Sequence, residues 1–387
     1  AASMDIVISD LEGYESGARM VILDACYNGS FNNDDYIASH YIFNPGNTVV
    51  VKGNSVNTLQ DTWTTELIGL LNWGVSAGNW AKGQLTLESH LIGDPTFEFG
   101  AQNIPAYFAV KKGFDVNHII STKKNDVKYW RSVLYAPVED ELACDYKSLA
   151  IQMLYNNNAI TSAELLDIQK NSNSKVLRLE AFNTIRKIAD SNFPESIILG
   201  LQDDYELTQR LAAMYAGKNY SPELVPAVAK GLMNPMTSDR VIFQLRGNLK
   251  GYNGADIVAE LEKCNNATPY WGGAEEFAKL LKLVENSDKS IEKEIASVMD
   301  GSMSVKEMRS FARGRRNGCE PKAVAPLVHI IKTAGDAELR LTAIEALGWY
   351  LYSSAKEDII AQCQELYNAE KDQAAKDELL KTINRLK

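Results

Sequence analysis

The chain has 387 residues, 45% of them hydrophobic and 23% charged, which is typical of globular proteins and long enough for two or three domains. Forty Lys and Arg residues against 50 Asp and Glu residues give a net charge of −10, which argues against broad nucleic-acid binding because that function needs a basic surface. The longest apolar runs are too short to cross a bilayer, and five widely spaced cysteines without a CxxC pair argue against a disulfide scaffold or a Cys-rich zinc site.

The first hundred residues combine strand and helix patterns. The apolar runs Met20–Leu23 and Asn47–Gly53 are typical of strands buried in a parallel sheet, and residues 34–43 between them predict a helix. Strand, helix and strand in this order form a βαβ unit. A further helix is expected over Trp63–Trp73, and Thr96–Phe99 is expected to be extended. We therefore predict an α/β fold for residues 1–100.

The rest of the chain is predicted to be helical. Residues 101–160 show few regular patterns and are expected to be a connector, whereas residues 161–387 have helical patterns almost throughout. Similar segments recur in this last part at intervals of roughly 30 residues, or about twice that. They begin at Arg178, Arg210, Arg240, Arg309 and Arg340. Helical pairs of this period predict an all-α solenoid that resembles HEAT repeats most closely in Ala323–Lys387. A non-repetitive helical bundle is the alternative.

Cys26 stands out as a candidate nucleophile. It ends the run Val21–Cys26 and precedes a turn that contains Gly29. In open parallel sheets, functional sites form beyond the carboxyl ends of the strands, where a thiol would be exposed in a crevice. Such a thiol needs a base or a cationic neighbour, most often histidine, to keep its thiolate populated. The alternative is that Cys26 is only a small buried hydrophobe at the end of a strand.

Several ordered segments of this region resemble the gingipain-type cysteine peptidase family. They are Leu23-Asp24-Ala25-Cys26-Tyr27-Asn28-Gly29-Ser30-Phe31, then Asp34-Asp35-Tyr36-Ile37-Ala38, then Gly46-Asn47-Thr48-Val49-Val50-Val51-Lys52-Gly53-Asn54-Ser55, and finally Leu91-Ile92-Gly93-Asp94-Pro95-Thr96-Phe97. The resemblance covers about a quarter of the chain. It implies that residues 1–100 are the second part of a caspase-like domain, a mainly parallel sheet with helices on both faces.

The same resemblance implies peptide-bond hydrolysis through a Cys–His dyad with Cys26 as the nucleophile. Cys26 would also supply a backbone N–H to the oxyanion hole, and Gly29 would shape the adjoining turn. The nearest candidates for the walls of the substrate pocket are Asn54, Ser55 and Val56, which follow the second strand.

The catalytic histidine of that family lies in a His-Gly motif upstream of the cysteine, and residues 1–25 contain no histidine. The four histidines of this chain are His40, His90, His118 and His329, and none matches the family position. Two hypotheses follow. In the first, the base lies on a separate upstream peptidase fragment that completes the sheet. In the second, the peptidase-like part is an inactive scaffold, and the helical repeats bind a protein partner.

The remaining features carry less weight. No cofactor is predicted, although calcium is compatible with the family, and the expected partners are peptide or protein substrates. The resemblance implies an extracytoplasmic location, secreted or periplasmic, in a bacterium. Asp94 is expected to anchor a turn, and Arg313, Arg315 and Arg316 are expected to lie in an exposed loop between helices.

Overall fold

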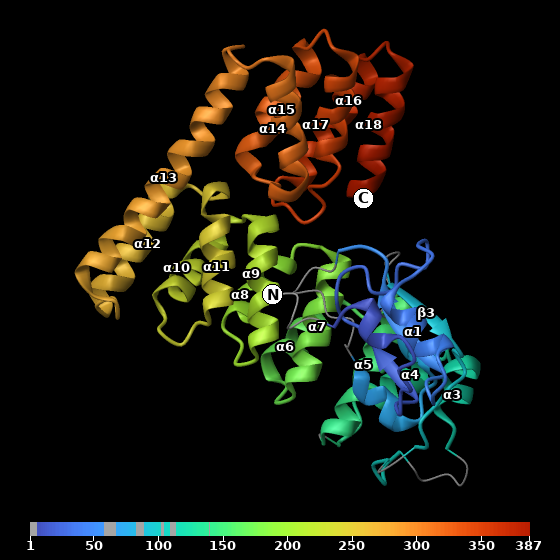
Figure 1. Ribbon diagram of the computed structural model, residues 1–387. Coiled ribbons are helices and arrows are strands. Elements are labelled where there is room, and N and C mark those ends of the chain that lie inside the picture. Colours follow the sequence, from blue (N-terminus) through green and yellow to red (C-terminus); the bar gives the residue numbers. More distant parts are fainter. Residues whose placement is uncertain (1–5, 58–66, 83–88, 102–103, 109–113, 139) are drawn as a thin grey trace. The chain divides into compact units, whose positions relative to one another are not determined.

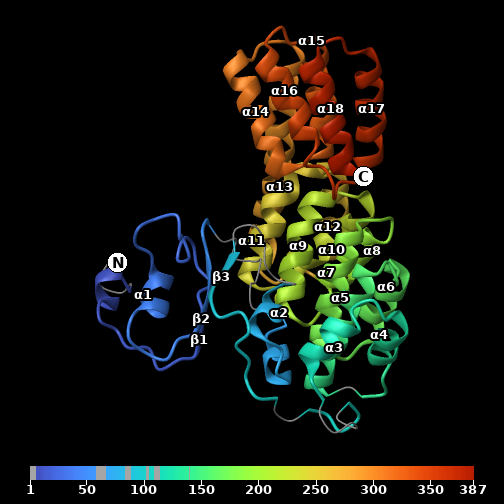
Figure 2. The same cartoon turned by 90° about the vertical axis from the view of Figure 1, so that its right-hand side faces the viewer.

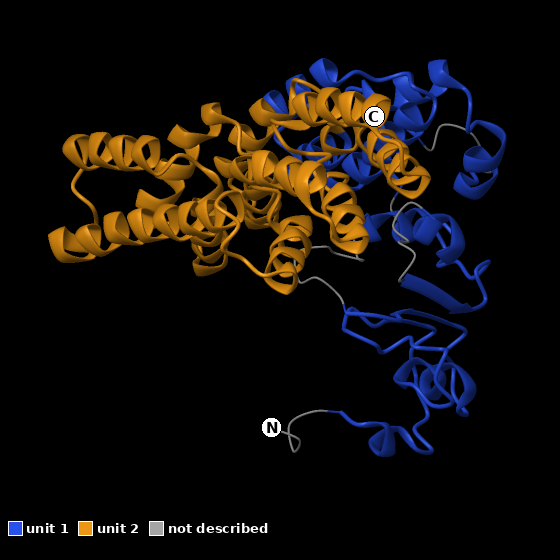
Figure 3. Ribbon diagram, turned by 90° about the horizontal axis from the view of Figure 1, so that it is seen from above, with its two compact units in different colours: residues 1–184 blue, residues 185–387 orange. Residues whose placement is uncertain are grey.

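The computed structural model describes residues 6–57, 67–82, 89–101, 104–108, 114–138 and 140–387. The chain divides into two compact units, residues 1–184 and residues 185–387 (Figure 3). The boundary falls inside α7 (Lys175–Ile188), so each unit contains part of that helix.

A small sheet opens the first unit. Its strands are β1 (Met20–Ile22), β2 (Val50–Asn54) and β3 (Ser89–Gly93), in the order β1-β2-β3 (Figure 2). β1 pairs with β2 in parallel, and α1 (Ile37–Phe43) connects them, as the predicted βαβ unit requires. β3 pairs with β2 antiparallel, with Gly53 opposite His90. All five residues of β2 are buried, the polar Lys52 and Asn54 as well as the apolar Val50 and Val51.

The prediction of a caspase-like, mainly parallel sheet with helices on both faces is wrong. Among the described residues the sheet has three strands, one of its two pairings is antiparallel, and the chain is mostly helical. Thr96–Phe99 is not part of the sheet, and this segment contacts the start of α2 (Ala77–Lys82). The N–H groups of Ala77 and Gly78 donate to the carbonyls of Phe97 and Pro95, at 2.8 and 2.7 Å.

Helices make up the rest of the first unit. The predicted helix over Trp63–Trp73 lies partly outside the described residues, and its end forms the 3₁₀ helix η3 (Ile68–Trp73). The described part of the region predicted to be a connector contains three α-helices. They are α3 (Val116–Thr122), α4 (Val127–Leu134) and α5 (Glu141–Asn156), and α6 (Ser162–Asn171) follows them. A short 3₁₀ helix, η2 (Ile8–Leu11), lies near the start of the unit.

Tyr146 of α5 is at the centre of an aromatic core in this unit. Its ring stacks on Trp73 with centroids 4.6 Å apart, and its hydroxyl lies 2.7 Å from that of Tyr129 on α4. Trp130 meets the same ring edge-on at 5.9 Å. Trp73 also donates its indole N–H to the carbonyl of Leu142, 2.9 Å away, so η3 and α5 are joined by both stacking and hydrogen bonding.

The second unit consists of helices that pack as successive hairpins, consistent with the predicted solenoid (Figure 1). Contacts run from α8 to α10 and α12 in one row and from α9 to α11 in another; further along, α14, α16 and α18 contact one another in order. The helices are α8 (Phe193–Leu201), α9 (Glu206–Asn219), α10 (Val225–Met233), α11 (Asp239–Asn248), α12 (Gly254–Ala267), α13 (Gly273–Met299), α14 (Val305–Gly318), α15 (Val324–Thr333), α16 (Ala337–Leu347), α17 (Lys356–Ala369) and α18 (Gln373–Leu386). Short 3₁₀ helices η4 (Pro222–Leu224), η5 (Leu249–Gly251) and η6 (Pro321–Ala323) join some of them.

Two of the arginines that mark the repeat, Arg309 and Arg340, form ion pairs between the last helices. We call these two ion pairs the arginine ladder. Arg309 of α14 binds Asp336, the residue that caps the N-terminus of α16, at 3.2 Å. Arg340 of α16 in turn binds Glu370, which lies just before α18. Arg340 also donates to the carbonyl of Ile331 at 3.0 Å. Each of these arginines therefore joins its own repeat to the loop that begins the next.

The basic cluster predicted as an exposed loop lies instead on α14. Arg315 is 7% exposed and pairs with the fully buried Glu320 at 3.1 Å and with Glu294 at 3.0 Å. Its guanidinium also lies over the ring of Phe311, 4.7 Å from the centroid. Glu320 receives a second cation, Lys250, at 2.9 Å. The cluster is thus largely a structural ion-pair network, which the sequence spacing alone did not reveal.

Candidate active site

The loop that follows β1 carries Cys26. After β1 the N–H of Leu23 continues the pairing by donating to the carbonyl of Lys52 at 2.8 Å. The chain then turns back along the end of β2, where Gly29 N–H donates to Asn54 O at 2.8 Å and Tyr27 N–H donates to Val56 O at 3.2 Å. The loop is therefore held to the end of β2 on both sides of Asn28.

Asn54 acts as a buried clamp for this loop. It is 3% exposed, and its Nδ2 donates to the carbonyls of Leu23 and Ala25, at 3.4 and 3.3 Å. Its Oδ1 accepts from Ser89 Oγ on β3 at 2.6 Å, and its backbone N–H donates to Asn28 Oδ1 at 2.9 Å. These bonds place the backbone just before Cys26 without using the thiol itself.

Gly29 is required by the close approach of this loop to β2. A Cβ at this position would lie 2.7 Å from the carbonyl carbon of Gly53 and 2.8 Å from the nitrogen of Asn54. Since the N–H of Gly29 is engaged by Asn54, the described geometry assigns Gly29 to the turn.

Cys26 is the one exposed cysteine of the five in the chain. Burial raises the pKa of the thiols of Cys319 and Cys363, to about 11 and about 12, and raises that of Cys144. Cys264 is partly buried, which raises the pKa of its thiol as well. Cys26 is flanked by Tyr27, which is 54% exposed and has a left-handed φ of 58°. Accessibility therefore distinguishes Cys26 from the other thiols.

His90 lies beside this loop, a position that no motif in the sequence predicts. Its Nε2 lies 2.8 Å from Ser55 Oγ, and its ring meets Phe31 edge to face with centroids 4.6 Å apart. His40, in contrast, binds Asp35 at 2.7 Å. Prediction of strand β3 and of its antiparallel pairing with β2 would have placed His90 here, because this pairing sets the histidine opposite Gly53.

The three predicted pocket residues differ in accessibility. Asn54 is buried and holds the loop, Ser55 is half-buried against His90, and Val56 is 39% exposed. Asp94 anchors a turn as predicted, since its Oδ1 accepts from the N–H and the hydroxyl of Thr96, at 2.8 and 2.6 Å. These hydrogen bonds lower the pKa of Asp94.

No cluster of three or more His, Cys, Asp or Glu side chains in the described segments could hold a metal ion. Of the helices that the structure describes, none has the length and apolarity needed to span a bilayer. Comparison with protein-family models and with curated proteins found no match to this chain.

Proposed function

We propose that this protein is a cysteine endopeptidase in which Cys26 is the nucleophile and the histidine base is supplied by a separate upstream polypeptide. The observation that carries the proposal is an exposed thiol on a loop that Asn54 and Gly29 hold in place. A nucleophile on a fixed loop loses little conformational freedom when it meets its substrate. The resemblance of this loop and its neighbouring strands to gingipain-type peptidases supports the same assignment.

In this mechanism the Cys26 thiolate attacks the carbonyl carbon of the scissile peptide bond, and the histidine returns a proton to the departing amine. The resulting thioester is then hydrolysed by water, which regenerates the thiol. A backbone N–H at Cys26 would stabilise the oxyanion. Tyr27 and Phe31, both exposed in this loop, would offer apolar contacts to a peptide.

The test is covalent labelling of the protein isolated from its natural source, together with any polypeptide that co-purifies with it. We expect peptide acyloxymethyl ketones with varied P1 side chains to label Cys26, as identified by mass spectrometry of the digested protein. Cys264 is the internal control, because its partly buried thiol has a raised pKa. Absence of label from Cys26 across the panel would refute the proposal.

A base within the chain is the alternative to an upstream fragment, and His90 is the histidine described beside the loop. His90→Ala distinguishes the two sources. If an upstream polypeptide supplies the base, the labelling rate of this variant in the same complex should stay close to that of the wild type. A loss of labelling comparable to that of Cys26→Ala would assign the base to His90.

A second candidate function is a scaffold whose helical repeats bind a protein. It is favoured by two large apolar side chains of the second unit, Met236 and Trp271, which are 85% and 63% exposed. In this case Cys26→Ala should leave the biological function intact, whereas Trp271→Ser should impair it.

A further inference from the structure

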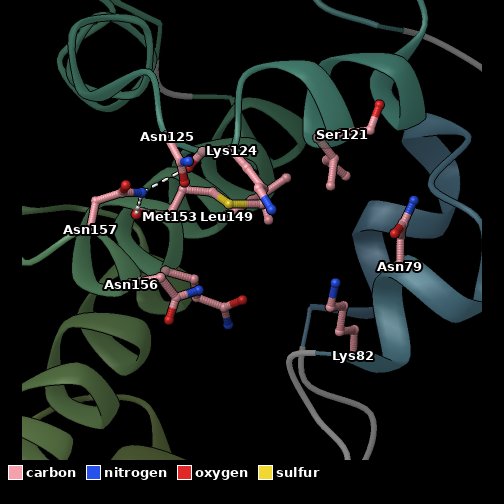
Figure 4. A pocket seen from close by; sticks show the side chains of 11 residues that line it. Asn79, Lys82, Ser121, Lys124, Asn125, Leu149, Met153, Asn156 and Asn157 are labelled. Carbon is pink, nitrogen blue, oxygen red and sulfur yellow. Dashed lines mark hydrogen bonds between the residues drawn. The ribbon is translucent and has the colours of Figure 1, made fainter.

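A polar pocket of about 530 Å³ lies within the first unit, and its described lining includes no residue of the loop that carries Cys26. Its walls come from α2, from the end of α3 with the turn after it, and from one side of α5 (Figure 4). Asn79 and Lys82 line one side of this space, and Asn156 and Asn157 line the opposite side. The volume is within the range of small-molecule sites.

Among the residues that the structure describes, the lining contains two lysines, Lys82 and Lys124, and no carboxylate. Within the described residues neither ammonium forms an ion pair. The nearest carboxylate along the turn is Asp126, which is already held by Lys123 at 2.7 Å. A protein with a net charge of −10 thus has a locally positive pocket here, and the pocket favours a ligand with at least one negative charge.

Three amide side chains add hydrogen-bonding capacity that the described protein does not use. They belong to Asn125, Gln152 and Asn156, and none of them bonds to another described residue. The neighbouring Asn157, in contrast, is fixed: its Nδ2 donates to the carbonyls of Lys124 and Met153, each at 2.7 Å (Figure 4). Asn157 therefore joins α5 to the turn that carries Lys124, so the wall is held in place while its amides remain available.

The chemistry of the lining identifies a class of ligand. An amide can donate and accept at once, which suits the hydroxyl groups of a sugar. Ile120, Leu149 and Met153 supply an apolar surface for the C–H face of such a ring. The described lining residues include no aromatic ring on which a nucleobase could stack. We propose that this pocket binds a small anionic polyhydroxylated molecule, a sugar bearing a carboxylate or a phosphate.

Isothermal titration calorimetry of the full chain tests the proposal with three probes: D-glucuronate, glucose 6-phosphate and neutral glucose. We expect at least one anion to bind more tightly than glucose and to bind less tightly as the salt concentration rises. Binding of one anion alone identifies the acid group, carboxylate or phosphate. Failure of both anions to bind, or equal affinity for glucose, overturns the proposal.

Substitutions locate the binding. Lys124→Ala and Lys82→Ala should each weaken anion binding by about tenfold, because each removes a charged hydrogen-bond donor. Gln152→Ala should weaken glucose and the anions alike. Lys128→Ala is the matched control, since Lys128 is exposed on α4 outside the lining and should leave every affinity unchanged. Anion binding that is unaffected by both pocket lysine variants would place the ligand elsewhere and overturn the assignment. These measurements do not involve Cys26, so their result is independent of the proposed peptidase activity.

Discussion

Asp145 on α5 gives the sharpest prediction about stability. Its carboxylate lies directly over η3, where a Cβ built on Gly69 would be 1.8 Å from Asp145 Oδ2. Burial, with a smaller contribution from the charge of Glu141, raises the pKa of Asp145 from 3.8 to about 6. We predict that Asp145→Asn, which keeps the shape and removes the charge, stabilises the first unit at neutral and basic pH.

The sign and size follow from the pKa. The folded protein keeps the proton up to about pH 6, whereas the unfolded chain releases it near 3.8, so unfolding releases a proton between these values. The free energy of unfolding therefore falls as pH rises through this window and stays lowered above it. The shift corresponds to about 3 kcal/mol. Because the carboxyl is partly exposed, solvent screening reduces this, and we expect a gain of about 1–2 kcal/mol at pH 8.

Hydrogen exchange of the α5 amides, read by mass spectrometry, measures the opening free energy of this region alone. Protection in Asp145→Asn should match the wild type at about pH 4, once rates are corrected for intrinsic exchange, and exceed it at about pH 8. Asp167→Asn is the control, because Asp167 is an exposed carboxylate on α6 of the same unit. A difference between variant and wild type that is the same at both pH values would refute the reasoning.

Three further substitutions test the loop, the sheet and the ion-pair network. Gly29→Ala should cost about 1–3 kcal/mol in urea unfolding and abolish labelling of Cys26, whereas Gly17→Ala, whose Cβ would meet no atom within 4 Å, should change neither. Gly93→Ala should destabilise the sheet by at least about 2 kcal/mol in the same assay, because Gly93 has a φ of 105° and its Cβ would lie 2.3 Å from Val49 O. Glu320→Gln should lower the unfolding free energy of the second unit by about 3 kcal/mol, because it leaves the buried Arg315 charge without its buried partner. The double variant Arg315→Met with Glu320→Leu removes both charges and should recover part of this loss. A double variant less stable than Glu320→Gln would contradict this.

The sequence pattern predicted those elements whose own residues have a clear strand or helix periodicity. The β-branched run that leads into β2 and the helix before it predicted the βαβ unit, since strands buried in a parallel sheet are rich in such residues. β3 was missed because it begins with Ser89 and His90 and contains few strand-forming residues. Its place is set by pairing with β2, which no pattern within the segment records. The caspase-like fold class was wrong because similar motifs alone do not determine which strands pair. The described chain forms a three-stranded sheet with one antiparallel pairing.

The candidate site divides in the same way. The position of Cys26 after a strand was readable, whereas its clamp depends on Asn54 and Ser89, which are 35 residues apart in the chain. The prediction of a solvated loop around Arg315 was wrong for a similar reason. The charge of the cluster does not show that the carboxylate of Glu320 is buried beside Arg315. The long-range bond between Asn54 and Ser89 and the burial of Glu320 are both set only when the elements pack together.

The arginine ladder has a mechanical consequence. Its rungs, Arg309 to Asp336 and Arg340 to Glu370, each join neighbouring repeats and skip none. Tension applied at the C-terminus would therefore be borne by the rungs in series rather than shared among them. Detachment would begin at α18, whose release leaves the rung between α14 and α16 intact. Pulled from that end, the array would lengthen in discrete steps, one helical pair at a time.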